Sequence, residues 1–210
     1  MNYFSQSEIV GFEQRFRTNF VNSLAGFRSL NLVGTIDMDG NENLAIFNSI
    51  FHVGSNPALI GMLVRPDGPE HGTLKNIIAN QQYTLNNVLK SFYKNAHQTS
   101  ARYDANDSEF AACGFKSKYV AQFSAPFVVE STIQIGLNLQ EVLPIKSNGT
   151  TLIIGAVQHV FLADSILQND GFVNPEIANT ITNCGLDAYY EAQIIARLSY
   201  AKPEKELNII

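Results

Sequence analysis

The spacing of apolar residues predicts a helix at the start of the chain. Ser5 and Glu8 have the spacing of an N-terminal capping box. The apolar positions that follow recur every three or four residues: Ile9, Phe12, Phe16 and Phe20. This period places them on one face of a helix. We therefore expect an amphipathic helix that packs on an apolar surface.

From residue 29 the pattern changes to one typical of β-structure. Residues 30–51 contain two runs rich in β-branched and apolar residues, separated by Asp39-Gly40. An Asp-Gly pair readily adopts the positive backbone angles of a tight turn. We expect two antiparallel strands joined at this turn.

The same reasoning predicts further elements along the chain. Residues 58–65 read as a third strand, residues 73–80 as a short helix and residues 83–89 as a fourth strand. Residues 91–114 are more polar and predict one or two short helices, one of them with Ser108 as its cap, which could act as a cover. More strands are expected within residues 127–139 and, after the turn pair Asn148-Gly149, within residues 150–163; residues 171–210 are mixed.

These elements favour a mainly β fold. Six or seven mostly antiparallel strands, with short helices at the ends and no regular alternation of strand and helix, predict a closed or partly closed barrel. With 210 residues, of which 45% are hydrophobic, the chain is long enough to bury one substantial core. We expect a single domain over residues 1–210.

Composition narrows the possible partners. The formal net charge is −5 and the basic residues are scattered, which argues against a nucleic-acid surface. Cys113 and Cys184 are too few and too far apart for a disulfide framework, so we expect free thiols in a reducing compartment, the cytoplasm. The N-terminus lacks the pattern of an export signal, and no uncharged apolar run reaches the ~18 residues of a membrane span. We expect a protein without membrane contact.

Common catalytic motifs are absent from the sequence. There is no glycine-rich dinucleotide or P-loop motif, no nucleophile elbow, no C-x-x-C pair and no H-E-x-x-H helix. The four histidines lie far apart: His52, His71, His97 and His159. We assign no metal site.

The stretch from Val64 to Ile77 gathers donors around a turn rich in proline and glycine. Thr73 precedes the predicted helix and can serve as its N-cap, so the free N–H groups of the first turn, its hydroxyl and Lys75 would converge on an anion. Arg65, leaving the preceding strand, could join them. The alternative is an ordinary capped helix beside two solvated cations.

Several segments, taken in order, resemble a known family. They are residues 31–66 (NLVGTIDMDGNENLAIFNSIFHVGSNPALIGMLVRP), HGTLKNI, YTLN, SARYDANDSEF, APFVVES and GLDAYYEAQIIARLSYAKP. Together they are similar to the flavin reductase-like proteins of the FMN-binding split-barrel fold. The resemblance implies a Greek-key split β-barrel with short peripheral helices, FMN as cofactor, and a homodimer with flavin near the subunit interface.

The resemblance also implies where FMN would bind. The segment from Ala45 to Ile50 would lie along the isoalloxazine and ribityl chain, with Asn48 and Ser49 as hydrogen-bond partners. The cofactor-binding positions implied are Ala45, Phe47, Asn48, Ser49, Ile50 and, toward the phosphate, Arg65, Thr73, Lys75 and Asn76. Two departures affect this transfer. Many relatives have a small hydroxyl residue at the position of Asn48, and the length of the turn at residues 67–72 varies, so His71 is either a partner of phosphate or a solvated loop residue.

Two functions are compatible with these residues. The first is an NAD(P)H-dependent flavin oxidoreductase, in which His159 is the candidate catalytic residue because relatives often carry a histidine near the nicotinamide late in the barrel. The second is a non-catalytic, flavoredoxin-like electron carrier that a separate protein reduces. The sequence shows no nicotinamide site that would decide between NADH, NADPH and neither.

Overall fold

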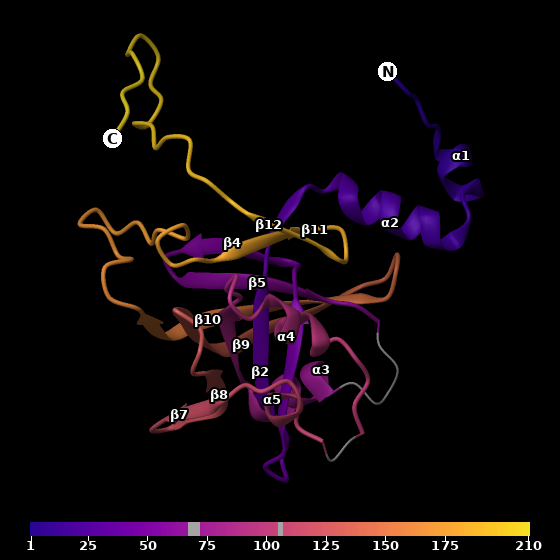
Figure 1. Cartoon of the computed structure of the whole chain (residues 1–210), viewed down its shortest axis with the longest axis vertical. Coiled ribbons are helices and arrows are strands. Elements are labelled where there is room, and N and C mark those ends of the chain that lie inside the picture. The colour runs from indigo at the N-terminus through magenta and orange to yellow at the C-terminus, as the bar shows by residue number, and fades with distance from the viewer. Residues whose placement is uncertain (67–71, 105–106) are drawn as a thin grey trace.

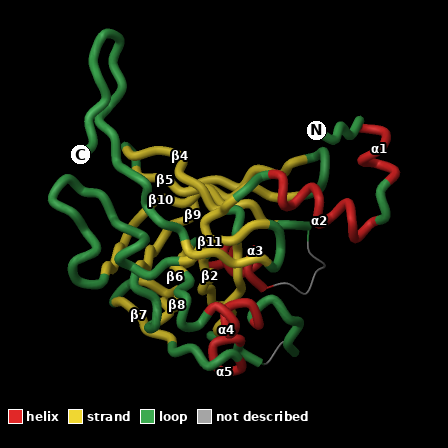
Figure 2. Tube along the Cα trace, turned by 45° about the horizontal axis from the view of Figure 1, so that its top comes forward, coloured by secondary structure: helices red, strands yellow, loops and turns green. Residues whose placement is uncertain are grey.

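The computed structural model describes residues 1–66, 72–104 and 107–210, and its main feature is a seven-stranded antiparallel sheet curled into a barrel (Figures 1 and 2). The strand order is β3-β2-β6-β9-β10-β5-β4. The bounds are β2 Asn31–Ile36, β3 Glu42–Phe47, β4 Ile50–Ser55, β5 Ala58–Val64, β6 Gln82–Asn87, β9 Ile133–Ile145 and β10 Thr150–Leu162. The predicted mainly β fold is confirmed.

The barrel is split between two strands that are consecutive in sequence. β3 and β4 stand at opposite ends of the strand order, although only Asn48 and Ser49 separate them. The chain therefore leaves one edge of the sheet at Phe47 and enters the other edge at Ile50. This crossing point is where the barrel is open.

Both predicted hairpin turns are confirmed. In the β2–β3 turn, Asp37 accepts hydrogen bonds at Oδ1 from the N–H groups of Asp39 (2.9 Å) and Asn41 (2.8 Å). Gly40 has φ +91°, which other residues rarely adopt. In the β9–β10 turn, Gly149 has φ +75°. These turns fix the register of the β2–β3 and β9–β10 strand pairs.

Two apolar clusters lie on the two faces of the sheet. The barrel interior contains Val33, Met62, Val64, Ile77, Tyr83, Leu85, Leu137 and Ile153. The second cluster lies under the cover and contains Leu30, Leu32, Leu44, Val88, Ala96, Phe110, Cys113, Phe115, Val128 and Ile181. The interior is tightly filled: a Cβ at Gly155 would lie 2.2 Å from Tyr83 Oη.

The remaining elements surround the barrel. Their bounds are α1 Gln6–Gly11, α2 Gln14–Leu24, β1 Phe27–Ser29, α3 Gly72–Asn80, α4 Tyr93–Gln98, α5 Glu109–Ala112, β7 Ser117–Val120, β8 Phe123–Val128, β11 Ile181–Cys184 and β12 Ala188–Glu191. β1, β11 and β12 form a small sheet, and β7 pairs with β8. None of the helices in the described residues is long and apolar enough to span a membrane.

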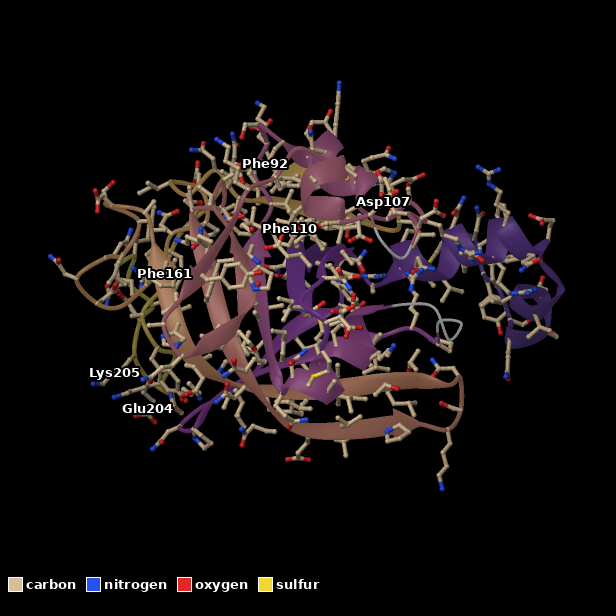
Figure 3. All side chains as sticks on the ribbon, turned by 90° about the horizontal axis from the view of Figure 1, so that it is seen from below. Phe92, Asp107, Phe110, Phe161, Glu204 and Lys205 are labelled. Atoms are coloured by element: carbon tan, nitrogen blue, oxygen red, sulfur yellow. The ribbon has the colours of Figure 1, made fainter. Side chains whose placement is uncertain are left out.

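The N-terminal region differs from the prediction. The capping box of Ser5 and Glu8 is present, but the predicted helix is interrupted at Phe12 and Glu13, where α1 ends and α2 has yet to begin. The expected packing on an apolar surface is also wrong, because neither helix contains a buried residue. Figure 3 shows the two helices projecting from the barrel.

Some strands were not predicted. The sequence prediction omitted β1, β4, β7, β11 and β12. The strand expected at residues 127–139 is two strands, because the chain turns after Val128 and β9 begins at Ile133. The cover at residues 91–114 does contain two short helices, α4 and α5. Ser108 is the N-cap residue of α5, but its side chain makes no capping hydrogen bond.

Candidate functional site

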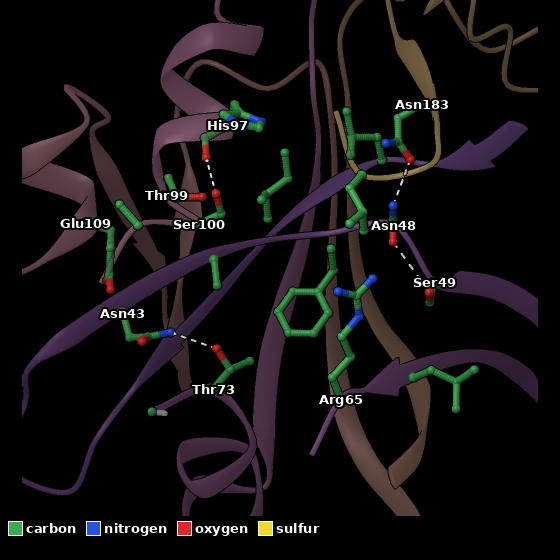
Figure 4. A pocket seen from close by; sticks show the side chains of 18 of the residues that line it. Asn43, Asn48, Ser49, Arg65, Thr73, His97, Thr99, Ser100, Glu109 and Asn183 are labelled. Atoms are coloured by element: carbon green, nitrogen blue, oxygen red, sulfur yellow. Dashed lines mark hydrogen bonds between the residues drawn. The ribbon is translucent and has the colours of Figure 1, made fainter. Parts of the chain in front are cut away.

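A pocket of about 310 Å³ opens at the split of the barrel. Its walls come from β3, the β3–β4 link, the end of β5, the first turn of α3, the cover and the β11–β12 hairpin (Figure 4). The lining residues are Leu30, Asn43, Ala45, Ile46, Phe47, Asn48, Ser49, Leu63, Arg65, Gly72, Thr73, His97, Thr99, Ser100, Ala101, Glu109, Asn183, Leu186 and Tyr189. Six of the nine predicted cofactor-binding residues are among them.

Asn48 is held by the C-terminal hairpin. Its Nδ2 donates to Asn183 Oδ1 (2.9 Å) and to the carbonyl of Gly185 (3.1 Å). Asn183 itself is only 1% exposed. Since an amide nitrogen carries two hydrogens, both are used, and Asn48 can offer a ligand only its Oδ1, which lies 3.5 Å from Ser49 Oγ.

Thr73 belongs to a buried polar network at the start of α3. The helix begins at Gly72, so Thr73 lies in its first turn and the prediction that it is the N-cap is wrong. Asn43 Nδ2 donates to Thr73 Oγ1 (3.1 Å) and to Thr35 Oγ1 (3.0 Å), and Asn76 Nδ2 also donates to Thr35 (3.3 Å). Thr73 therefore accepts from Asn43, and its own hydroxyl hydrogen has no acceptor among the described residues, so it can be donated to a ligand.

Gly72 keeps this part of the pocket open. A Cβ at this position would lie 2.9 Å from Asn43 Oδ1 and 3.4 Å from Asn76 Nδ2. Any larger side chain would displace the amide that holds Thr73. The backbone at the helix start can thus approach a ligand closely.

Arg65 supplies positive charge at the pocket. Its side chain is exposed, and Nη2 donates to Asn22 Oδ1 of α2 (3.2 Å). Among the described residues it forms no ion pair with a carboxylate. Its charge is therefore available to an anionic ligand.

Three predicted residues do not line the pocket. Lys75 is exposed, Asn76 is buried and bonded to Thr35, and Ile50 packs against the barrel interior. His71 lies outside the described residues.

The cover contributes the roof of the pocket. A carboxylate oxygen of Glu109 accepts the N–H of Leu44 (3.0 Å). His97 Nδ1 lies 2.5 Å from Tyr189 Oη, which joins α4 to β12 above the pocket. Burial, reinforced by the Asp187 carboxylate, raises the pKa of Tyr189. The phenol therefore stays protonated and can donate to His97.

His159 is not brought to the pocket. It is half-buried on β10, where its ring packs edge-on against Phe123 with centroids 5.2 Å apart. His97 is the pocket-lining histidine within the described chain.

The sequence prediction missed several pocket residues: Asn43, His97, Glu109, Asn183 and Tyr189. Asn43 faces Thr35 directly in the β2–β3 register, so the predicted hairpin could have indicated it. His97 and Glu109 lie in the segment that was expected to form a cover. Asn183 and Tyr189 had no such local indication.

Comparison with known proteins adds a family match. A family model described as flavin reductase like domain matches residues 28–175. The chain is similar to a split-barrel protein from Shewanella frigidimarina NCIMB 400 whose assignment as a flavin reductase is provisional. The two are 44% identical, with a TM-score of 0.92, and the match covers 96% of this chain and 100% of that one.

Two more distant structures share the fold. Nitrilotriacetate monooxygenase component B from Bacillus cereus is 20% identical, with a TM-score of 0.83 and coverage of 94% of this chain and 98% of its own. Flavoredoxin of Desulfovibrio vulgaris (Miyazaki F) is 21% identical, with a TM-score of 0.70 and coverage of 85% and 92%. At these identities the likeness shows the fold alone.

Proposed function

This chain belongs to the flavin reductase-like family, and from that premise we propose that it is an FMN-binding oxidoreductase that uses NADH or NADPH. Bound FMN would supply the redox chemistry, since its ring accepts a hydride and passes electrons on. The protein then needs no acid–base pair of its own. Its residues have to bind the cofactor, orient it and leave one face accessible.

The pocket has the composition that FMN requires. Ala45, Ile46, Phe47 and Leu63 provide apolar surface for a flat ring, whereas Thr73 and Arg65 provide donors for a phosphate. The volume of about 310 Å³ is at the lower end of the ~300–1,000 Å³ typical of small-molecule pockets. FMN therefore fits the kinds of group present.

Binding of the phosphate is assigned to the start of α3. The first-turn N–H groups of a helix favour an anion, and the Thr73 hydroxyl, whose oxygen accepts from Asn43, can donate its hydrogen to a ligand. Arg65 adds charge without a carboxylate partner in the described chain. This set of anion donors at the mouth of an apolar pocket is the observation that carries the proposal.

Orientation of the ring is assigned to the β3–β4 link. Asn48 can only accept a hydrogen bond, through Oδ1, because its Nδ2 is fully used by Asn183 and Gly185. Ser49 can donate or accept. A polar ring edge that presents an N–H group beside an acceptor would match this pair.

Anaerobic stopped flow tests the use of a nicotinamide. The FMN-loaded protein is mixed with NADH or NADPH while flavin absorbance is followed, and rapid bleaching with either nucleotide is the expected result. If neither nucleotide reduces the flavin but dithionite or a separate reductase does, the protein is the flavoredoxin-like electron carrier instead.

Two histidine variants locate the nicotinamide in the same experiment. His97→Ala is expected to slow bleaching several-fold, because His97 lines the pocket. His159→Ala is the matched control, since His159 packs on Phe123. The opposite result, with only His159→Ala slow and FMN retained, would return the catalytic role to His159 and place the nicotinamide on the β10 side.

The assembly and the compartment complete the proposal. The family resemblance implies a homodimer with flavin near the subunit interface. Both cysteines are free thiols, and Cys113 is buried. This state suits a reducing compartment, and we expect the protein to act in the cytoplasm.

A further inference from the structure

The roof of the pocket is held by a contact between two segments that lie far apart in the chain, His97 of α4 and Tyr189 of β12. Tyr189 Oη lies 2.5 Å from His97 Nδ1. Both residues line the pocket, and His97 is seen at its upper edge in Figure 4. Tyr189 lies outside residues 28–175, which the family model matches. The family match therefore does not give the role of this contact.

Tyr189 is held in place from two sides. Tyr93 and His97 are four positions apart on α4, so they lie on the same face of the helix. The ring of Tyr189 lies 5.3 Å from that of Tyr93, at 53°, and 5.8 Å from that of His97, at 82°. Within its own hairpin, Tyr189 is paired with Asn183, whose side chain holds Asn48. The hairpin that fixes Asn48 thus also fixes the partner of His97.

The backbone of His97 is fixed as well. Its carbonyl oxygen accepts hydrogen bonds from the N–H group of Ser100 (3.0 Å) and from Ser100 Oγ (2.7 Å), just after the end of α4. The ring can then change its direction only by rotation about the side-chain bonds. The hydrogen bond at Nδ1 restricts that rotation.

The hydrogen bond between the two side chains has two possible directions when the imidazole is neutral. Either Tyr189 Oη donates to Nδ1, or an Nδ1–H group donates to Oη. In the second arrangement the phenol hydrogen would need another acceptor, and Tyr189 Oη forms no other hydrogen bond with the described residues. Tyr189 is half-buried, so an unused O–H group would cost free energy. The first arrangement is therefore favoured.

The electrostatic surroundings agree with this direction. Burial, with a further contribution from the Asp187 carboxylate, raises the pKa of Tyr189. The phenol thus keeps the hydrogen that it donates. When Nδ1 of a neutral imidazole is an acceptor, the ring proton is on Nε2.

Nε2 is the nitrogen that remains for a ligand. In residues 1–66, 72–104 and 107–210 it has no hydrogen-bond partner, whereas Nδ1 is occupied by Tyr189. A neutral N–H group is a suitable donor for a carbonyl oxygen. Both a nicotinamide and the ring of FMN carry such carbonyl groups.

We propose that Tyr189 is a positioning residue that fixes neutral His97 with its proton on Nε2, so that His97 donates a hydrogen bond to a carbonyl oxygen of a ligand in the pocket. The inference rests on the proposed function for the identity of that ligand. The state of the imidazole ring can be measured without any ligand.

Nuclear magnetic resonance of the full-length protein with isotope-labelled histidine tests the state of the ring. At about pH 8.5, where an ordinary imidazole is neutral, His97 should give the signals of the Nε2–H tautomer; His97→Ala identifies them among the four histidines. Tyr189→Phe should raise the fraction of the Nδ1–H tautomer several-fold. The matched control is Tyr190→Phe, since Tyr190 is exposed on the same strand and packs on Phe27. This variant should leave the tautomer unchanged.

The same signals identify the ligand. FMN is added first, and NAD⁺ or NADP⁺ is added next, because the oxidised nucleotides do not reduce the flavin. A shift of the Nε2–H signal at the first step assigns the carbonyl to the flavin, and a shift at the second step assigns it to the nicotinamide. Either shift supports the donor role of His97.

Rates of flavin bleaching by NADH or NADPH add a functional measurement. Tyr189→Phe should slow bleaching by about 2- to 10-fold, the effect of one hydrogen bond, and should have no further effect in the His97→Ala background. His97→Gln should keep more of the rate than His97→Asn, because the longer amide brings its N–H groups near the position of Nε2.

The outcomes that contradict the inference are distinct from failure of the proposed function. An Nδ1–H tautomer or a doubly protonated ring in the unmodified protein would overturn it, as would a tautomer that Tyr189→Phe leaves unchanged. An Nε2–H signal that moves with neither FMN nor the nucleotides would overturn the donor role. If the tautomer is as expected and neither NADH nor NADPH reduces the flavin, only the proposed function fails. Circular dichroism shows whether each variant is folded, and the tautomer of the unmodified protein decides even where a variant is not.

Discussion

The pocket is bordered by two polar clusters that are built in different ways. In the first, Asn43 donates to Thr35 and Thr73, which are 8 and 30 positions away in the chain. In the second, Asn48 donates to Asn183 and Gly185, which are 135 and 137 positions away. The first cluster thus lies within one continuous stretch, whereas the second forms only when the C-terminal hairpin docks on the barrel.

The difference indicates which side of the pocket is more easily opened. The first cluster is built on β2, β3 and α3, and α3 anchors Ile77 in the barrel interior. The second depends on β11, which pairs with β1 over only three residues. Elements with few contacts open at lower free energy than the core. We therefore expect the hydrogen bonds around Asn48 to open first, while those between Asn43, Thr35 and Thr73 remain formed.

The largest effect is expected at Arg65, which belongs to neither cluster. Arg65→Leu should weaken FMN binding about 10- to 100-fold, because a charge-assisted hydrogen bond contributes roughly 1.5–3 kcal/mol. Riboflavin, which has no phosphate, should bind the variant and the unmodified protein alike. Isothermal titration measures both ligands.

Lys75→Leu is the matched control for Arg65, since Lys75 is exposed but does not line the pocket. It should leave FMN affinity unchanged. If Arg65→Leu weakened riboflavin as much as FMN, or if the unmodified protein bound the two equally, no phosphate site would exist here.

A double-mutant cycle sharpens the comparison at the Asn48 side. Asn48→Leu and Asn183→Leu should each lower the free energy of unfolding by about 1–3 kcal/mol, because each leaves a polar partner unsatisfied. Combined, they should cost less than the sum of the two, since neither amide is then left alone. Urea denaturation of the apoprotein gives these values. Strictly additive costs would show that the two amides do not stabilise each other.

A smaller effect is expected at the Thr73 side. Thr73→Val removes the hydroxyl but keeps the shape, and Asn43 retains Thr35 as an acceptor. The loss of stability should be about 0.5–1.5 kcal/mol, whereas FMN affinity should fall by more because the ligand loses a donor. Urea denaturation and titration of the same variant compare the two. A stability loss larger than that of Asn183→Leu would reverse the comparison.

Local patterns predicted much of the fold. Asp39-Gly40 and Asn148-Gly149 specified two hairpins because the turn residues and the flanking alternation are contiguous. β4 escaped prediction because it is an edge strand with Phe51 and Val53 exposed, so it lacks the alternation of a half-buried strand. The N-terminal helix also shows that an apolar pattern does not fix helix ends. The apolar period continues across Phe12, but the helical backbone is interrupted there.

The part of the site that is built from residues close together in sequence could be predicted. Arg65 and Thr73 reach the pocket, but Lys75, two residues after Thr73 in a helix, is rotated by about 200° and points away. Asn76, three residues on, returns to the same side one turn deeper and bonds to Thr35 instead. Asn183 could not have been found, because nothing near it in sequence indicates that it meets Asn48.

The pairing of β1 with β11 also determines when in its synthesis the protein can become able to bind flavin. The β9–β10 hairpin joins neighbouring residues across a tight turn and can form in about 1–10 μs. β11, by contrast, pairs Cys184 with Phe27, so it leaves the ribosome long after its partner strand. At about 5–20 residues per second, the nascent barrel has seconds to fold before the segment that holds Asn48 arrives. We expect newly made chains to pass through a folded barrel with a half-built pocket, and the cofactor to enter only after translation has nearly finished.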